Sequence, residues 1–246
     1  MVGEERLPGG FVTPVVRVGN TVRRRPPEDP EFVHALLEWF ERLGWGGAPK
    51  FLGTDELGRE VLSVVDGHVA WAQDQPPSVT SDASLARVAA MVREFHDLTA
   101  GTPLAAGAEV VCHNDLSPKN TAYRDGGTGL VPVAFIDWDI AAPGRRMHDV
   151  AHVCWQYVGL GPRCCDPADA GRRMRLICDA YGLADRGGLL ETILWWQDRC
   201  WRGIDAKAAA GDPAMIRLRD SGAVRSVRDA FDWVSGQRAE LAAYLR

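Results

Sequence analysis

HNDLSPKN at residues 113–120, followed by FIDWD at 135–139, is the stretch of sequence that decides the fold. β-rich runs overlap both segments, and we predict strands over 120–125 and 131–137 joined by the glycine-rich turn at 126–129. In such an antiparallel hairpin, residue 125 would lie opposite 131, and residue 120 opposite about 136.

This register brings Asn120 close to Asp137, because cross-strand neighbours lie about 5 Å apart at Cβ. Carboxylate and amide oxygens are ligands that Mg²⁺ accepts together with water and phosphate oxygens. Asp115 precedes Asn120 in the connecting loop, where it can orient an attacking hydroxyl and accept its proton. Lys119 is placed to steady a γ-phosphate. The pattern therefore predicts phosphoryl transfer.

The same segments resemble the aminoglycoside phosphotransferase family, which shares the protein-kinase-like fold with choline kinases. The similarity covers the H-x-D-x-x-x-x-N loop at 113–120 and the I-D-W segment at 136–138. It continues at 149–151, where D-V-A stands in place of the family's D-L-A. The convincing part of the resemblance extends over about residues 85–155.

The resemblance implies a kinase that transfers the γ-phosphoryl group of ATP or GTP, with Mg²⁺, to a hydroxyl of a small molecule, including antibiotics. By this resemblance Asp115 is the catalytic aspartate, while Asn120 and Asp137 are magnesium ligands. His113 and Asp149 would hold the catalytic loop in place.

The order of predicted elements agrees with an α+β, two-lobed protein-kinase-like fold. A small β-rich, nucleotide-binding lobe is expected at residues 1–70, and a larger, mainly helical lobe at 71–246 would carry the catalytic loop and the acceptor site. In the small lobe we expect a β-hairpin, a helix and two further strands, at 11–24, 31–43, 49–53 and 60–66.

In the larger lobe, Ser81 or Asp82 is expected to cap a helix. Its predicted apolar face is formed by Leu85, Val88, Val92 and Phe95. A short strand is expected at 109–112. From residue 149 onward the chain should be largely helical, with breaks near 159–167, 182–187 and 211–213.

Kinases of this type carry a strand lysine that contacts the α- and β-phosphates and pairs with a helix glutamate. Here the corresponding strand offers only arginines, and Arg24 is the candidate, since Arg23 would point to the other face. For the helix partner, three candidates remain open: Glu38, Glu41 and His34.

Two further segments are expected to contact the nucleotide. Residues 63–66, with Val64 and Val65 at their centre, should supply hinge backbone groups to the base. Gly9 and Gly10 are expected to begin the loop over the phosphates, although a G-x-G-x-x-G pattern does not follow.

The acceptor is expected to bind near a helix at 188–208, which carries three carboxylates spaced seven residues apart. They are Glu191, Asp198 and Asp205. Such a stripe can hold a cationic acceptor through charge-assisted hydrogen bonds. The alternative is a solvated acidic face offset by Arg199 and Arg202.

Composition excludes several other classes. The net charge of −5, without a long basic run, argues against nucleic acid and anionic membranes as partners. The N-terminal segment is acidic and does not resemble a signal peptide. The six cysteines form neither a CxxC pair nor zinc-type spacing, which suits reduced thiols in a cytoplasmic protein.

Two alternatives to a kinase remain. His96-Asp97 and His148-Asp149 are HD pairs, a feature of metal-dependent phosphohydrolases, although such sites are usually built wholly on helices. The second alternative is a kinase-like binding or immunity protein that holds nucleotide without turning it over. The missing lysine favours it, and the complete set of Asp115, Asn120 and Asp137 opposes it.

Overall fold

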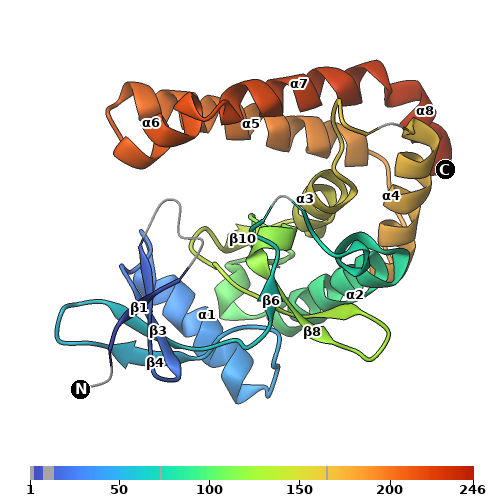
Figure 1. The fold of residues 1–246 in the computed structure, drawn as a ribbon. Coiled ribbons are helices and arrows are strands. Elements are labelled where there is room, and N and C mark those ends of the chain that lie inside the picture. Colours follow the sequence, from blue (N-terminus) through green and yellow to red (C-terminus); the bar gives the residue numbers. More distant parts are fainter. Residues whose placement is uncertain (1–2, 8–13, 73, 165) are drawn as a thin grey trace. The chain divides into compact units, whose positions relative to one another are not determined.

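A computed structural model describes residues 3–7, 14–72, 74–164 and 166–246 of the chain (Figure 1). The chain forms two compact units, Met1–Asp149 and Val150–Arg246. Antiparallel sheets belong to the first unit and most of the helices to the second, which confirms the predicted α+β class. The functional division of the chain at residue 70 stays a prediction.

The small sheet of the first unit has five strands in the order β1-β2-β3-β5-β4. Their bounds are Glu5–Arg6, Val15–Val18, Thr21–Arg24, Phe51–Thr54 (β4) and Glu60–Ser63 (β5). The predicted hairpin is confirmed, with Val18 opposite Thr21. Gly19 has a φ of 59°, a left-handed conformation that glycine adopts without steric cost.

Both strands predicted over 49–53 and 60–66 have different bounds. β4 begins at Phe51, after Pro49, which cannot donate a ladder hydrogen bond. β5 ends at Ser63, and the next N–H, that of Val64, donates at 3.2 Å to the carbonyl of Asn20 in the β2–β3 turn. The predicted hinge segment therefore leaves the sheet directly after Ser63.

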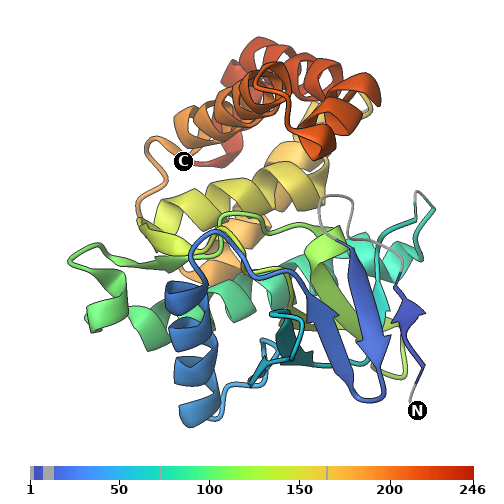
Figure 2. The ribbon, with the colours of Figure 1, turned by 90° about the vertical axis from the view of Figure 1, so that its left-hand side faces the viewer.

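Helix α1 (Pro30–Arg42) lies beside the small sheet (Figures 1 and 2). Asp29 caps it, since its carboxylate accepts a hydrogen bond from the N–H of Phe32, and proline occupies the first helical position. The buried residues of α1 are Val33, Leu36, Leu37 and Phe40, spaced as on one helical face.

Helix α2 (Asp82–Thr99) begins at the predicted place, with Ser81 as its cap. The four residues of its predicted apolar face, Leu85, Val88, Val92 and Phe95, are all buried. Trp138 lies 5.2 Å from Phe95 and 5.2 Å from Phe40 between ring centroids. These rings join α1, α2 and the segment after β9 in one core, which fixes the position of the FIDWD segment.

Three shorter pairings complete the first unit. β6 (His68–Val69) pairs with β8 (Thr121–Asp125), which pairs with β9 (Leu130–Phe135). β7 (Val110–Cys112) pairs with β10 (Ala142–Gly144). Three 3₁₀ turns lie between these elements: Pro77–Thr80, Pro103–Ala105 and Pro118–Asn120.

The register predicted for the β8–β9 hairpin is wrong at the turn and right at the site. Asp125 lies opposite Leu130, one residue from the prediction. A bulge then adds one residue to β9 just after Pro132, which has no N–H to donate. Beyond the bulge the predicted pairing holds, because the N–H of Ile136 donates to the carbonyl of Asn120 at 2.9 Å.

The remaining helices are α3 (Arg146–Val158), α4 (Pro167–Tyr181), α5 (Leu189–Ala209), α6 (Pro213–Asp220), α7 (Ala223–Gly236) and α8 (Arg238–Tyr244). The predicted breaks are confirmed, and further breaks occur at Ser221–Gly222 and at Gln237. In the second unit, α5 packs along α7 (Figure 1).

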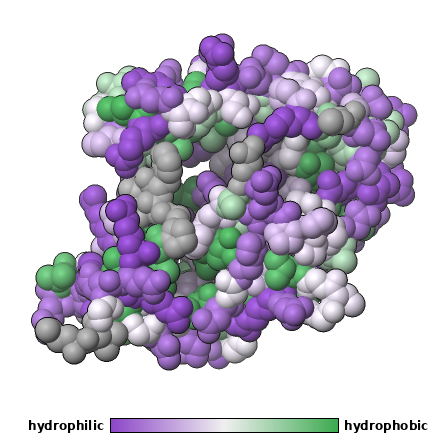
Figure 3. Space-filling view, viewed as in Figure 1, coloured by the Kyte–Doolittle hydropathy of each residue, from purple (hydrophilic) through white to green (hydrophobic). Residues whose placement is uncertain are grey.

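Hydrophilic side chains cover most of the face shown in Figure 3. Among the described residues, the exposed large hydrophobic side chains are distributed over several elements and loops: Leu43, Leu52, Leu57, Trp71, Val131, Ile140 and Trp195. In the described parts of the chain, every helix is too short or too polar to cross a membrane.

Candidate active site

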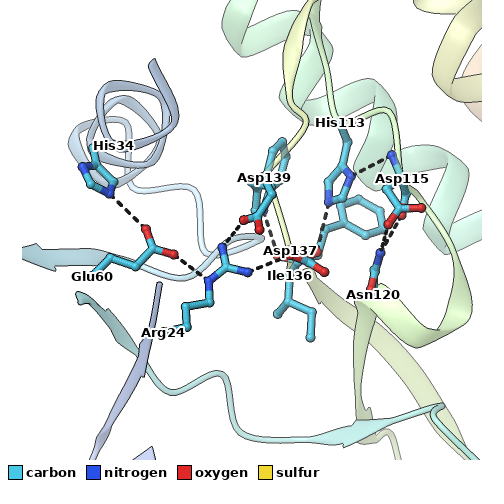
Figure 4. A network of polar contacts seen from close by, with 11 residues as sticks. Arg24, His34, Glu60, His113, Asp115, Asn120, Ile136, Asp137 and Asp139 are labelled. Carbon is cyan, nitrogen blue, oxygen red and sulfur yellow. Dashed lines mark hydrogen bonds and ion pairs between the residues drawn. The ribbon is translucent and has the colours of Figure 1, made fainter. Parts of the chain in front are cut away.

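The loop between β7 and β8 holds Asp115 through two neighbours (Figure 4). The side-chain amide of Asn120 donates to the backbone carbonyl of Asp115 and to its carboxylate Oδ2, each at 2.8 Å. The amide oxygen of Asn120 is thereby left for another contact. His113 Nδ1 accepts the N–H of Asp115 at 3.3 Å, and its Nε2 contacts the carbonyl of Ile136 at 3.1 Å. His113 is therefore a neutral ring with its hydrogen on Nε2.

Asp149 binds the backbone at the start of this loop. Its Oδ2 accepts the backbone N–H of His113 at 2.7 Å, and its Oδ1 accepts that of Asn114 at 2.9 Å. Asn114 has a φ of 66°, a sparsely populated conformation for a residue other than glycine. Asp149 is wholly buried, so these N–H groups are the partners that its charge requires.

His96 of α2 is a third partner of Asp149, with 3.1 Å between Nε2 and Oδ2. Burial and the neighbouring Arg146 lower the pKa of His96, against the opposing effect of the Asp149 carboxylate. Burial alone would raise the pKa of Asp149, but the hydrogen bonds from His96 and Asn114 hold it below its ordinary value. The pair is thus a neutral histidine donating to a carboxylate. Sequence analysis missed this role of His96.

Asp137 follows β9 and also has a φ of 66°. Its side chain is 44% exposed, and Oδ1 accepts a hydrogen bond from Arg24 Nη1 at 2.7 Å. Asp139 pairs with Nη2 of the same guanidinium. Burial raises the pKa of Asp139 to about 7, with Arg24 acting against the shift and Asp137 adding to it.

Arg24 stands at the end of β3, directly across from Glu60 in β5. Its Nε donates to Glu60 Oε1 at 2.5 Å, so its guanidinium is in contact with three carboxylates. Burial opposes the charge, but these carboxylates raise the pKa of Arg24 and keep it protonated. Arg23 points elsewhere and pairs with Asp55 at 3.3 Å.

The acidic partner of Arg24 is not on the helix where it was expected. Glu38 and Glu41 are both exposed, and Glu41 pairs with Lys50. They were wrong as candidates because both are exposed, whereas Arg24 is buried. His34, the third candidate, contacts Glu60 at 2.9 Å rather than Arg24 itself. A single acidic residue at the start of the otherwise uncharged, mostly apolar segment 60–65 was the signal that Glu60 is buried.

The other predicted nucleotide contacts come from three separate segments of the chain. Lys119 is exposed on the 3₁₀ turn before β8. Val64 and Val65 line a cavity of about 240 Å³, whose other walls come from the end of α1, the α1–β4 connection and Arg124. The segment at Gly9 and Gly10 lies outside the described residues.

The acidic stripe predicted for the acceptor lies on α5, in the second unit. Two of its three carboxylates are paired: Asp198 with Arg202 at 2.8 Å, and Glu191 with Arg238. Asp205 is exposed. This arrangement agrees with a solvated face in which arginines offset the acidic charge.

The HD pairs do not form a hydrolase centre. Asp97 pairs with Arg93 and Arg146, whereas His96 binds Asp149 of the other HD pair. The ligand atoms of His96, Asp149 and Cys112 lie within 4.8 Å of one another. However, Asp149 already accepts three N–H groups, and burial keeps the Cys112 thiol protonated by raising its pKa. The cluster is therefore structural.

Comparison with known proteins connects this site to a family. A model of the phosphotransferase enzyme family, APH, matches residues 101–191, which contain Asp115, Asn120, Asp137 and Asp149. The trifolitoxin immunity protein of Rhizobium leguminosarum bv. trifolii is 31% identical over 217 residues, which are 76% of this chain and 78% of that protein.

Two solved structures show the same fold at low identity. An aminoglycoside phosphotransferase of Streptomyces rimosus has a TM-score of 0.60 and 18% identity over 79% of this chain and 92% of its own. An ethanolamine kinase of Plasmodium vivax has a TM-score of 0.53 and 14% identity over 99% and 82%. Because the family model matches the segment that holds these residues, and the 31% identical relative covers 76% of the chain, this chain belongs to the phosphotransferase enzyme family that includes the aminoglycoside phosphotransferases.

Proposed function

We propose that this protein is a Mg²⁺-dependent kinase that transfers the γ-phosphoryl group of ATP or GTP to a hydroxyl of a small molecule. The observation that carries the proposal is the fixed carboxylate of Asp115. The side-chain amide of Asn120 donates to one oxygen of this carboxylate at 2.8 Å. The backbone N–H of Asp115 donates to Nδ1 of His113. The second carboxylate oxygen is the one proposed to orient the acceptor hydroxyl and take its proton.

The donor atoms near Asp115 suit a magnesium ion. Asp137 offers a half-exposed carboxylate, and the amide of Asn120 directs its nitrogen to Asp115, so its oxygen remains as a ligand. These hard oxygen donors, few in number, fit an ion that keeps water and phosphate oxygens as its other ligands. When bound, the ion would neutralise charge on the nucleotide phosphates.

Arg24 is the proposed contact for the α- and β-phosphates. It lies beside Asp137, stays charged, and presents a planar fork that matches phosphate oxygens. Lys119 is proposed to approach the γ-phosphate, and the backbone of Val64 and Val65 to contact the base. Asp149 and His113 are proposed to keep the loop in shape through their hydrogen bonds.

The nature of the acceptor follows from relatives by analogy. The Streptomyces rimosus enzyme was solved with ADP and streptomycin, and another aminoglycoside phosphotransferase with GDP and kanamycin. We therefore take an antibiotic as the leading acceptor class. Asp198 and Asp205 remain proposed contacts for a cationic acceptor. The ion pair between Asp198 and Arg202 must break before Asp198 can bind the acceptor.

A nucleotide-release screen tests the proposal. The protein is incubated with Mg²⁺ and either ATP or GTP, and ADP or GDP release is measured across antibiotics, amino alcohols, sugars and nucleosides. Acceptor-dependent release that is absent in Asp115→Asn supports the kinase. The proposal fails if no acceptor stimulates release, or if Asp115→Asn releases nucleotide diphosphate as fast as the natural protein.

A second candidate is an immunity protein that binds nucleotide without transferring phosphate. Two observations favour it: the phosphate-site cation is Arg24 instead of lysine, and a relative with 31% identity is named as an immunity protein. Tight Mg²⁺-dependent nucleotide binding in the absence of any turnover would identify this second function.

A further inference from the structure

Glu60 is a wholly buried carboxylate with two partners on different elements (Figure 4). Its Oε1 accepts Nε–H of Arg24 from β3 at 2.5 Å. Its Oε2 lies 2.9 Å from Nε2 of His34 on α1. A carboxylate can only accept, so His34 donates its Nε2 hydrogen. Both contacts are needed, because a buried charge without hydrogen bonds is costly.

The ring of His34 is itself fixed. It stacks on the ring of Phe51 in β4, with 3.6 Å between centroids and 13° between planes. The direction of the Nε2–H bond is therefore set by α1 and β4 together. Glu60 receives this hydrogen bond on the oxygen that does not face Arg24, so His34 limits the rotation of the Glu60 carboxylate.

The orientation of Glu60 determines the orientation of Arg24. A guanidinium is planar, so holding its Nε–H also fixes the directions of both amino groups. These groups point to Asp139 and to Asp137, which is a proposed metal ligand. A chain of contacts thus runs from α1, through His34 and Glu60, to the cation proposed to bind phosphate.

We propose that Glu60 and His34 are positioning residues that aim Arg24 at the nucleotide phosphates. The acid comes from β5, and the helix supplies a histidine in place of the glutamate expected there. The expected effect on nucleotide affinity rests on the proposed function. The contacts that orient Arg24 can be tested without nucleotide. Neither residue touches the reacting atoms, so their effect should be on nucleotide affinity.

Two substitutions of His34 separate hydrogen bonding from packing. His34→Phe keeps a ring to stack on Phe51 and removes the donor, whereas His34→Gln keeps a donor and removes the ring. Glu60→Gln keeps the shape and removes the charge. His68→Phe is a matched control, because His68 is also half-buried and hydrogen-bonded, to Gln75 at 2.6 Å.

Two measurements are made on each variant. The first is the ¹H–¹⁵N signal of the Arg24 Nε–H group in the nucleotide-free protein, assigned by its loss in Arg24→Lys. The second is the KM for the nucleotide together with kcat, or the Kd of Mg²⁺–nucleotide where turnover is absent. Thermal unfolding identifies any variant that fails to fold. If His34→Phe is such a variant, the same two measurements on Glu60→Gln replace it, and the same loss of Arg24 protection and of nucleotide affinity is expected.

In His34→Phe we expect Arg24 Nε–H to exchange with water at least about tenfold faster, and KM or Kd to rise about tenfold, with kcat changed less than about threefold. His34→Gln should recover most of both effects, and His68→Phe should match the natural protein. The proposal is overturned if His34→Phe leaves the Arg24 signal unchanged, or if the glutamine variant is as impaired as the phenylalanine variant. If the natural protein binds no nucleotide, the proposed function fails, and the exchange measurement still decides the role of His34.

Discussion

Asp149→Asn is the substitution whose effect can be worked out most fully from the contacts. The new asparagine keeps most contacts if its amide oxygen takes the Oδ2 position, where it still accepts from the backbone N–H of His113 and from Nε2 of His96. The NH₂ group then faces the backbone N–H of Asn114, which loses its acceptor. Losing a charge-assisted hydrogen bond costs about 1.5–3 kcal/mol, and an unsatisfied buried donor costs about 1–3 kcal/mol. We therefore expect the free energy of unfolding to fall by about 3–5 kcal/mol.

For a chain of this size, such a loss lowers the Tm by about 6–20 °C. Thermal and urea unfolding of the two proteins measure it directly. Asp97→Asn is the matched control, since Asp97 pairs with Arg93 and Arg146 at the surface and each exposed pair is worth about 0.2–1 kcal/mol. A loss below about 1 kcal/mol in Asp149→Asn, or equal losses in the two variants, would refute the reasoning.

The same contacts predict how stability depends on pH. Asp149 has a pKa below its ordinary 3.8, and His96 has one below its ordinary 6.5. In both cases the unfolded chain binds more protons than the folded one, so stability decreases as pH falls. The loss should begin below about pH 6.5 through His96 and grow below about pH 4 through Asp149. Urea unfolding between about pH 5 and pH 3 should show a smaller loss of stability in Asp149→Asn, because that variant lacks the carboxylate that titrates there. An equal loss in this pH range would contradict the assignment.

Three further predictions concern the chemistry. Asp115→Asn should lower kcat by at least about a hundredfold with little change in nucleotide affinity, and a kcat near that of the natural protein would remove Asp115 as the base. Arg24→Ala should raise the KM for nucleotide more than Arg23→Ala, since only Arg24 reaches Asp137, and equal effects in a kinetic comparison would argue against a phosphate contact. Asp137→Ala should abolish the Mg²⁺ dependence of nucleotide binding in calorimetric titrations, and an unchanged dependence would exclude this metal site.

The site residues that sequence analysis placed correctly in space belong to one short hairpin and its loop. Asn120 and the segment at Asp137 are brought together by local β pairing, which depends on nearby residues and a glycine-rich turn. The register error lies between the turn, where Asp125 pairs with Leu130, and Pro132, where a bulge follows. Because the bulge lies between the turn and the site, its extra residue restored the predicted pairing.

Contacts across long sequence separations were not predictable in the same way. His96 and Asp149 are 53 residues apart, and Arg24 and Glu60 are 36 apart. Their meeting depends on how α2 and the strands pack, which the periodicity of each element does not specify. A glutamate on the helix was expected only from the resemblance to kinases. In the structure Glu60 of β5 is the carboxylate beside Arg24.

The charges around Arg24 give opposite expectations for the removal of Asp137 and for the removal of Arg24 itself. One guanidinium contacts three carboxylates, those of Glu60, Asp137 and Asp139, so the free site carries an excess of negative charge that repels nucleotide phosphates. Removing Asp137 lowers that repulsion and releases Arg24 for phosphate, so metal-free nucleotide should bind Asp137→Ala at least as well as the natural protein. Removing Arg24 increases the excess, so Arg24→Ala should depend on Mg²⁺ more strongly. Calorimetric titration of nucleotide with and without Mg²⁺ measures both effects, and a Mg²⁺ dependence that Arg24→Ala leaves unchanged would contradict this account of the charges.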